Sequence, residues 1–309
     1  MESGLVFSRE KSYNRGRKEV WPVASDLHIH MLLDGVNYRQ AIRRHSSGPA
    51  EGWIHSCLAA YQRRGIRFLR DEGDHLGVAL RARALAPDYG IDYRCPAFPI
   101  HKEGHYGAIV GRGYGDHAAY HALLDEAEAL NADFVKLMIS GLIDFSRPHS
   151  LTEPALEAEE IRYLIEAAHD RGFAVTVHAN GDDAVLPAIL AGADSVEHGA
   201  FLSEECLCAM GEYQTLWVPT LVTVGNLIGD GRFPDAVLRP LLQEQLEKVA
   251  FAAKAGARIG AGSDAGAYRV LHGSGAGEER ALLQLALGEK SAALLEEAET
   301  YVQTRFRRK

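Results

Sequence analysis

The fragments RRGIRFL (residues 63–69) and DRGFAVT (residues 170–176) each join a helix pattern to a strand pattern through one glycine. LAGADSV (residues 190–196) and KAGARIG (residues 254–260) repeat this arrangement. Glycine is common just after a helix because it adopts the left-handed conformation that ends the helix. Several of the strand patterns are apolar on both faces, as in parallel sheets covered by helices. These fragments therefore predict alternating helices and parallel strands.

The same alternation extends over most of the 309 residues. Strands are expected at residues 23–30, 66–71, 91–98, 133–139, 173–179, 194–198, 215–220 and 257–263. Helices are expected at residues 49–64, 76–85, 117–130, 152–169, 184–191, 203–213, 235–255 and 278–306, with Thr152 and Ser203 as N-caps. Eight strand–helix units in this order predict an α/β fold of the (β/α)8 TIM-barrel class, with a doubly wound open sheet as the alternative.

Composition restricts the class of protein. Hydrophobic residues make up 47% and charged residues 24%, as in ordinary globular enzymes. Lysine and arginine number 33 against 42 acidic residues, and the resulting net charge of −9 argues against a nucleic-acid partner. The four cysteines are thinly spread, so we expect reduced thiols in a cytoplasmic protein. No run of 18 apolar residues predicts a membrane helix, and the first 20 residues lack the apolar core of a signal peptide.

Metal-ligand side chains lie where the expected strands end. The set is His28, His30, Lys136, His178, His198 and Asp264. The carboxyl ends of barrel strands face the mouth of the active site, and burial of that many unpaired imidazoles would be costly. A metal centre explains the set, because imidazole and carboxylate ligands suit zinc, iron, manganese or nickel. The set exceeds what one tetrahedral ion needs, which favours two metals with a shared water of lowered pKa.

Seven motifs resemble the amidohydrolase superfamily, and they extend in its order over residues 26–266. They are DLHIH (26–30), FLRDEGD (68–74), FVKLMISG (134–141), VTVHANG (175–181), GADSVEHGAFLSEE (192–205), WVPTLVT (217–223) and GSDAG (262–266). The spacing between VHAN and EHG and the lysine of FVKLMISG are similar to the branch that holds imidazolonepropionases and metal-dependent Xaa-Pro dipeptidases.

This resemblance implies two divalent metal ions, with zinc as the expected metal. The histidines of DLHIH and Asp264 would bind the first metal, and the histidines of VTVHANG and VEHG would bind the second. Lys136, carboxylated by CO2 on its side-chain nitrogen, would bridge both. A single metal is the alternative, because imidazolonepropionase-like enzymes can use one. Family members usually carry a β-sandwich built from both chain ends. About 22 residues before the first strand are too few for it, so we expect one domain over residues 1–309, with the barrel proper at about 23–290.

Such a centre implies a hydrolase. A hydroxide that bridges the metals would attack the carbonyl carbon of an amide, cyclic amide or dipeptide. Asp264 would be the catalytic residue that carries the proton of the water to the leaving nitrogen. We expect a small, carboxylated substrate. The alternatives are a lactonase or phosphotriesterase that acts on an ester, and a barrel that binds a ligand without catalysis.

Substrate contacts are expected mainly in the loop at residues 99–117, which contains five glycines. Loops at this face of a barrel carry function, and cationic side chains there would suit a carboxylate on the substrate. The expected contacts are His105, Arg112, His101 and Tyr106 from this loop, and Arg70 and Tyr268 from other strand ends. A homo-oligomer is compatible with the sequence.

Overall fold

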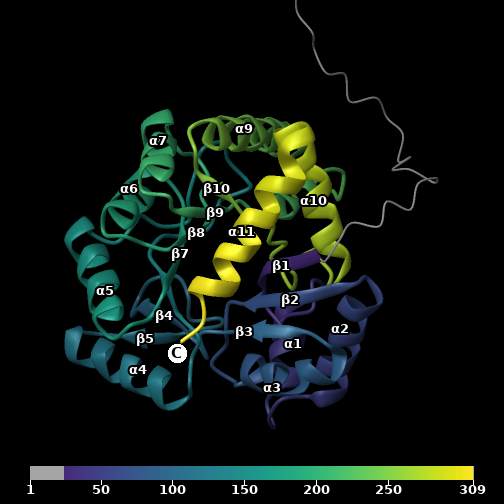
Figure 1. Cartoon of the computed structure of the whole chain (residues 1–309), viewed down its shortest axis with the longest axis vertical. Helices are drawn as coiled ribbons and strands as arrows, with labels where there is room; N and C mark the ends of the chain where they lie inside the picture. Colours follow the sequence, from purple (N-terminus) through teal and green to yellow (C-terminus); the bar gives the residue numbers. More distant parts are fainter. Residues whose placement is uncertain (1–23, 309) are drawn as a thin grey trace, which may run out of the picture.

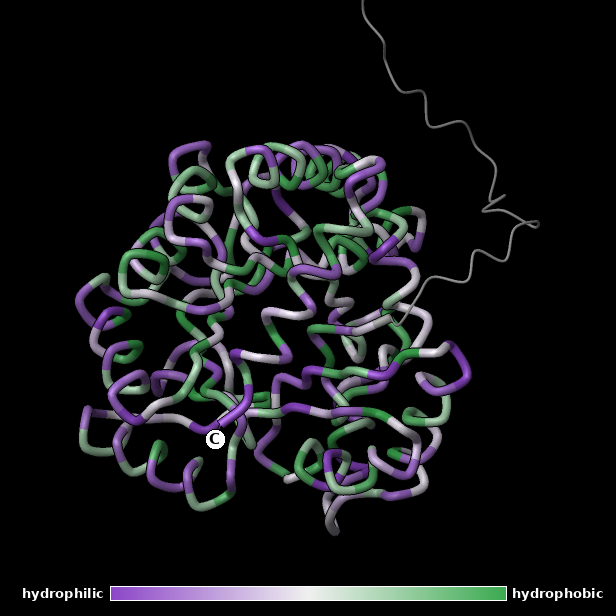
Figure 2. The backbone as a smooth tube through the Cα atoms, in the orientation of Figure 1, coloured by the Kyte–Doolittle hydropathy of each residue, from purple (hydrophilic) through white to green (hydrophobic). Residues whose placement is uncertain are grey.

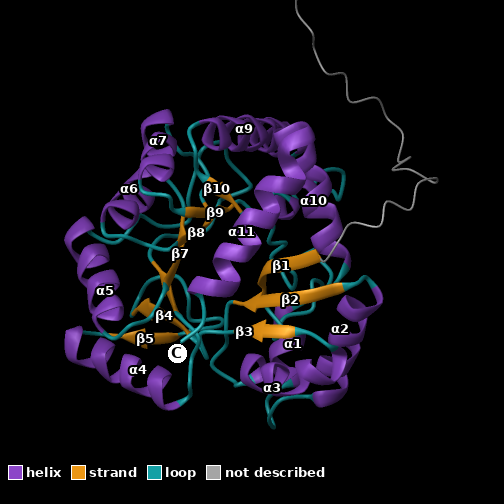
Figure 3. Ribbon diagram, viewed as in Figure 1, coloured by secondary structure: helices purple, strands orange, loops and turns teal. Residues whose placement is uncertain are grey.

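The computed structural model describes residues 24–308. The expectation that the chain has no signal peptide concerns residues that lie outside this range. Strands and helices alternate along the described chain (Figure 1), and the helices surround the strands (Figure 3). All of the strand pairs are parallel. The predicted parallel α/β fold is therefore confirmed.

The strands of residues 24–308 form two sheets. The smaller sheet has the order β1 (Ala24–Ile29), β2 (Ile66–Asp71) and β3 (Asp92–Arg94). The larger sheet has the order β10 (Arg258–Ile259), β9 (Leu216–Val218), β8 (Ser195–His198), β7 (Val175–Ala179), β6 (Val135–Met138), β4 (Pro99–Lys102) and β5 (Arg112–Tyr114). Each region predicted as a strand contains one. Strands β4 and β5 are additions, because they lie in the segment expected to be a loop.

The ladder of hydrogen bonds does not close into one ring in the described part of the chain. Between β3 and β4, Pro96 has no amide hydrogen to donate and Ala97 has a φ of +66°, so strand pairing stops there. Between β1 and the segment after β10, single bonds replace a ladder, such as the 2.8 Å bond from His30 N to Ala265 O. The pairing of the described strands therefore shows a parallel α/β fold, but it does not show a closed eight-stranded barrel.

Helices cover the outside of both sheets. They are α1 (Tyr38–Arg44), α2 (Glu51–Arg63), α3 (Val78–Leu85), α4 (His117–Ala129), α5 (Ala158–Asp170), α6 (Asp182–Leu190), α7 (Glu204–Glu212), α8 (Val222–Gly225), α9 (Asp235–Lys254), α10 (Ser274–Leu287) and α11 (Ser291–Arg305), with 3-10 turns η1 (Ala86–Tyr89) and η2 (Gly288–Lys290). Hydrophobic and hydrophilic residues alternate along them, as amphipathic helices require (Figure 2). No helix within residues 24–308 is long and apolar enough to cross a membrane.

One predicted helix start is wrong. Helix α5 begins at Ala158 rather than at Thr152. The backbone N–H of Thr152 instead donates to Leu142 O at 2.8 Å, and its hydroxyl oxygen accepts from Leu142 N at 2.9 Å. Pro154 follows two residues later and is compatible with this extended course. The chain therefore forms a longer loop after β6 than the sequence predicts.

Two other helix ends have clear local causes. Ser203 is the N-cap of α7 as predicted, since its hydroxyl oxygen accepts a hydrogen bond from Cys206 N at 3.2 Å. The single helix expected at residues 278–306 is divided into α10 and α11, because Gly288 adopts a φ of +61°. The short helices α1 and α8 have no counterpart in the prediction.

Helix α11 lies across the amino ends of the strands (Figure 1). The residues buried in this contact are Leu27, Phe68, Phe134, Ala174, Leu216, Val218, Ala298, Val302 and Phe306. The C-terminal helix therefore covers one end of the strands with an apolar cluster, and the polar residues gather at the other end.

Candidate active site

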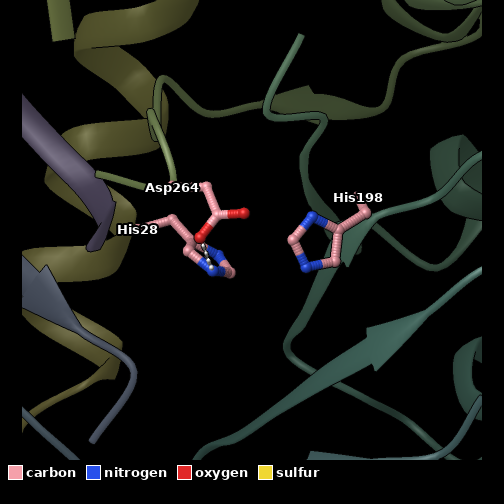
Figure 4. A group of neighbouring side chains, drawn as sticks. All are labelled: His28, His198 and Asp264. Atoms are coloured by element: carbon pink, nitrogen blue, oxygen red, sulfur yellow. Dashed lines mark ion pairs between the residues drawn. The ribbon is translucent and has the colours of Figure 1, made fainter. Parts of the chain in front are cut away.

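Five metal-ligand side chains meet at the carboxyl ends of the strands. His28 lies in β1, His30 just after it, His178 in β7, His198 at the end of β8 and Asp264 beyond β10. The ring centres of His28 and His198 are 5.0 Å apart, and those of His178 and His198 are 4.6 Å apart. Asp264 Oδ1 lies 3.3 Å from His30 Nε2. Figure 4 shows Asp264 and His28 beside each other, across from the His198 ring.

His28 shows the clearest sign of a metal ligand. Its Nδ1 lies 2.6 Å from Glu197 Oε2, and such a bond leaves the lone pair on Nε2. Among residues 24–308, no group forms a hydrogen bond with the buried Nε2, although buried polar atoms usually have a partner. Ligand atoms of His28, His198 and Asp264 all lie within 4.8 Å of one another. These donors fit a divalent transition metal.

A second acidic group lies next to His28. Glu72 Oε1 is 3.8 Å from His28 Nδ1, and Glu72 Oε2 is 2.6 Å from Lys136 Nζ. Ligand atoms of His28, Glu72 and Glu197 also lie within 4.8 Å of one another. Lys136 is buried on β6, where it forms an ion pair with Glu72. The expected carboxylation of Lys136 is therefore a chemical step beyond what these contacts show.

Arg70 holds Glu197 in place. Its Nη2 donates to Glu197 Oε1 at 2.6 Å, and its Nε donates to Leu27 O at 2.6 Å. Burial raises the pKa of Glu197, but the Arg70 charge and the His28 contact outweigh it and hold the pKa well below its usual range. Arg70 is fully buried. Within the described residues, it does not line the cavity that opens beside His178, His198 and Asp264. Its side chain is instead held by Glu197 and by the backbone of Leu27.

Two imidazoles and the carboxylate of Asp264 have protonation states that suit metal binding, whereas at His30 the effect of burial is outweighed by a hydrogen bond with Asp264, which raises the pKa of His30. Burial, with the Lys136 charge, lowers the pKa of His178 to about 3. Burial and then the His178 charge lower the pKa of His198 well below its ordinary value. Burial raises the pKa of Asp264, but a hydrogen bond from His30 and the nearby imidazoles lower it overall. Neutral imidazoles and an ionised carboxylate are the forms that bind metals.

Three residues of the site have left-handed backbone conformations. The φ angles are +69° at His198, +49° at Thr220 and +58° at Asp264. Each such residue costs about 1–3 kcal/mol, and residues of this kind cluster at functional sites. The Thr220 hydroxyl lies 2.8 Å from His198 Nδ1, and Glu279 secures the following turn by accepting from Val222 N at 2.8 Å. The strained backbone thus orients the His198 ring.

A cavity of about 320 Å³ opens at these residues. Its polar lining includes His178, Asn180, His198 and Asp264. Its remaining lining residues are Leu142, Ile143, Phe145, Thr223, Leu227, Arg232, Phe233, Ala267 and Tyr268. A mostly apolar cavity with a few convergent polar groups is the usual form of a small-molecule site.

Two of the expected substrate-binding residues lie at this site. Tyr268 lines the cavity. The Tyr106 ring lies 5.0 Å from the His178 ring, and burial, followed by the Asp264 charge, raises the pKa of the Tyr106 hydroxyl. Tyr106 therefore remains a neutral hydrogen-bonding group close to His178.

The other residues of the segment at residues 99–117 that were expected to contact substrate lie away from the cavity lining. His101 is buried, with Nδ1 2.9 Å from Lys102 O. Arg112 forms an ion pair with Glu126. His105 donates its backbone N–H to Lys102 O. In the described part of the chain none of these three side chains lines the cavity, because β4 and β5 pair and fold the segment back on itself.

Sequence reasoning missed Glu72, Glu197 and Arg232. Glu72 lies in FLRDEGD and Glu197 directly precedes His198 in VEHG. Glu72 directly follows β2 and Glu197 lies near the end of β8. A carboxylate at the carboxyl end of a strand is a signal that could have found both, because a buried charge needs a partner. Arg232 lies in a glycine-containing loop with no such signal.

A profile described as the amidohydrolase family matches residues 23–302. The chain belongs to the amidohydrolase family. The fold of this family member is similar to that of a Xaa-Pro dipeptidase with bound methionine, with a TM-score of 0.72 and 22% identity over 92% of this chain and 76% of that chain. It is also similar to ochratoxinase of A. niger, with a TM-score of 0.71 and 19% identity over 93% of this chain and 72% of that one. These identities show a shared fold.

Two curated relatives match part of this family member. An uncharacterized protein of Mycobacterium tuberculosis is 35% identical over 140 residues, which is 43% of this chain and 38% of that protein. Ochratoxinase of Aspergillus niger is 30% identical over 138 residues, which is 43% of this chain and 28% of that enzyme. The match thus spans less than two fifths of the length of either relative.

Proposed function

We propose that this family member is a metal-dependent hydrolase that cleaves a C–N bond of a small, carboxylated molecule. The observation that carries the proposal is the buried His28, whose Nε2 forms no hydrogen bond within residues 24–308 and lies 3.6 Å from Asp264 Oδ1, close to His198. The names of two similar proteins, Xaa-Pro dipeptidase and ochratoxinase, support an amide rather than an ester as the bond cleaved.

The donors of His28, His198 and Asp264 fit a metal site, and we propose that it holds two divalent ions, with zinc as the metal. His28, His30 and Asp264 would hold one ion, and the histidines of β7 and β8 would hold the other. Lys136 would bridge them as an N-carboxylated anion, since a free ammonium would be repelled by two cations. When bound, the ions would polarise the carbonyl group and lower the pKa of a water molecule. We also propose that residues 1–309 form one domain of the TIM-barrel class.

The protein residues supply the proton transfers. The oxygen of water attacks the carbonyl carbon of the amide, and the C–N bond breaks. Asp264 is ionised, so it accepts a proton from the attacking water and then donates it to the leaving nitrogen. The products are a carboxylate and an amine. Tyr106, which is neutral and lies against His178, is placed to donate a hydrogen bond to the substrate.

Metal analysis and a substrate panel test this function. Protein purified without chelators should contain close to two equivalents of transition metal and should hydrolyse members of a panel of N-acyl amino acids, Xaa-Pro dipeptides and cyclic ureides. Lactones serve as the ester comparison. Turnover of lactones alone would contradict C–N hydrolysis. Metal-free protein that is folded and fully active would contradict a metal-dependent mechanism.

A further inference from the structure

Part of the cavity wall is aromatic and comes from two loops. Phe145 lies in the loop between β6 and α5, and Phe233 lies between α8 and α9. Their ring centres are 5.4 Å apart, so the two loops meet through this contact. Ile143 and Leu227 extend the apolar surface. Such a wall favours a large apolar or aromatic group, because ring contacts bury much apolar area.

Arg232 adds a positive charge to the same cavity. Its guanidinium carbon lies 4.4 Å from the centre of the Tyr268 ring and 5.3 Å from that of Phe233. Within residues 24–308, no carboxylate forms an ion pair with Arg232. Asp230, two residues earlier, already pairs with Arg269 and accepts from the Tyr268 hydroxyl at 3.2 Å. The Arg232 N–H groups are therefore available for a ligand.

The electrostatics of Asp230 agree with this. Its pKa is lowered first by the hydrogen bond from Arg269, and the Arg232 charge is the smallest of the contributions. By contrast, the two arginines first expected to contact substrate have close acidic partners. Arg112 pairs with Glu126, and Arg70 pairs with the buried Glu197. Within residues 24–308, the arginine that lines this cavity without an acidic partner therefore lies in the loop before α9.

We propose that Arg232 binds the carboxylate of the substrate while Phe145 and Phe233 bind an apolar or aromatic group beside it. This inference rests on the proposed hydrolase function and adds a substrate class to it, namely N-acylated amino acids or dipeptides with a large apolar side chain. Stacking on Tyr268 orients the planar guanidinium, which then offers two parallel N–H donors to a carboxylate. A cavity of about 320 Å³ suits a molecule of this size, because ligand sites span roughly 300–1,000 Å³.

A matched pair of ligands tests the charge recognition. N-benzoyl-L-phenylalanine carries the carboxylate, and its N-methylcarboxamide has the same shape without the charge. Binding of each is measured by calorimetry in the slow Asp264→Asn background, and KM and kcat are measured in the otherwise native enzyme. Arg232→Gln should weaken binding of the acid about tenfold and raise its KM similarly, as expected for loss of a charge-assisted contact. Binding of the carboxamide should change less than about twofold.

The control is Arg147→Gln. Arg147 is an exposed arginine that pairs with Asp144 and lies in the same loop as Phe145. It should leave the preference for the acid unchanged. Arg232→Lys should recover part of the preference, since it retains the charge but not the planar fork. Metal content should be equal in all of these variants, which excludes an indirect effect through the ions.

Removal of the aromatic wall tests the second half of the inference. Phe145→Ala should reduce the preference for N-benzoyl over N-acetyl ligands about tenfold. The inference is overturned if Arg232→Gln weakens the acid and the carboxamide equally, or if the native protein binds neither. If the acid and the carboxamide are weakened equally but the protein keeps its metal and its hydrolytic activity, the proposed function is not contradicted. Absence of metal and hydrolysis would instead contradict the proposed function, while the calorimetry still decides what Arg232 recognises.

Discussion

Replacement of Glu197 by glutamine should weaken both folding and metal binding. Glu197 contacts Arg70 on one side and His28 on the other, each at 2.6 Å, and all three side chains are at most 1% exposed. Glutamine has nearly the same shape but no charge. The variant therefore leaves the Arg70 guanidinium buried without its main counter-charge, and it replaces the carboxylate that orients the His28 ring.

The contacts set the size of both effects. Removal of one partner from a buried ion pair costs about 3–5 kcal/mol. Glu72 Oε1 remains 3.5 Å from Arg70 Nε and compensates in part, so we expect about 3 kcal/mol. At about 2–4 °C per kcal/mol for a chain of this size, the melting temperature falls by roughly 6–12 °C. Loss of the carboxylate beside a metal-binding histidine weakens metal affinity about 10–100-fold.

Two assays separate these effects. Thermal melting in excess chelator measures the stability of the metal-free protein, and competition with a chromophoric chelator measures metal affinity. The matched control combines Glu197→Gln with Arg70→Met. Because this double variant has no unpaired buried charge, it should regain most of the stability lost in the single variant. Its metal affinity should remain low, since His28 still lacks its carboxylate.

The effect of Glu197→Gln on stability and its effect on metal affinity can be refuted separately. A melting temperature within about 2 °C of the parent would show that the Arg70–Glu197 pair does not stabilise the fold. Metal affinity within about twofold of the parent would show that Glu197 does not orient His28 as a ligand.

Four further predictions follow from single contacts. Lys136→Ala should bind less metal and regain some activity with a short carboxylic acid in solution; native mass spectrometry of the parent should detect the carboxyl adduct, and a bare lysine with both metals bound would contradict the bridge. Asp264→Asn should lower kcat roughly 10²–10⁴-fold while it retains part of the metal, and turnover within a few-fold of the parent would exclude its role in proton transfer. Phe306→Ala should destabilise the metal-free protein by about 3–5 kcal/mol in urea titrations, because the ring is fully buried against the strands, and a loss below about 1 kcal/mol would show that the cluster is not required. Burial raises the pKa of Glu279 to about 8 from 4.5, so the folded protein keeps a proton that the unfolded chain releases, and stability should fall as the pH rises from about 5 to 8; Glu279→Gln should flatten this dependence, and an unchanged slope would contradict it.

The alternation of strands and helices could be predicted because its signals are local. Gly65 and Gly256, for example, end a helix and begin a strand within a few residues, and both adopt positive φ angles. The convergence of His28 and Asp264 was also within reach, because parallel strands bring their carboxyl ends to one side. The break in strand pairing between β3 and β4 could not be predicted, because it depends on how Pro96 and the residue after it bend the chain.

Side-chain partners were the least predictable part of the site. Arg70 follows the pattern of a residue at a strand end, yet its partner Glu197 lies 127 positions away. Arg112 is similarly neutralised by Glu126 on the next helix. A sequence shows which residues are charged but not which charges meet, so it could not show that Arg112 has an acidic partner while Arg232 forms no ion pair within residues 24–308.

The most direct test of the metal centre is anomalous scattering from crystals of protein purified without chelators and loaded with zinc. We expect a peak about 2.0–2.1 Å from His28 Nε2, with His198 and Asp264 beside the bound ions. A folded, zinc-treated protein with no peak at these residues, or with His28 Nε2 hydrogen-bonded to a protein group instead, would contradict the central claim that the histidines and Asp264 form a metal site.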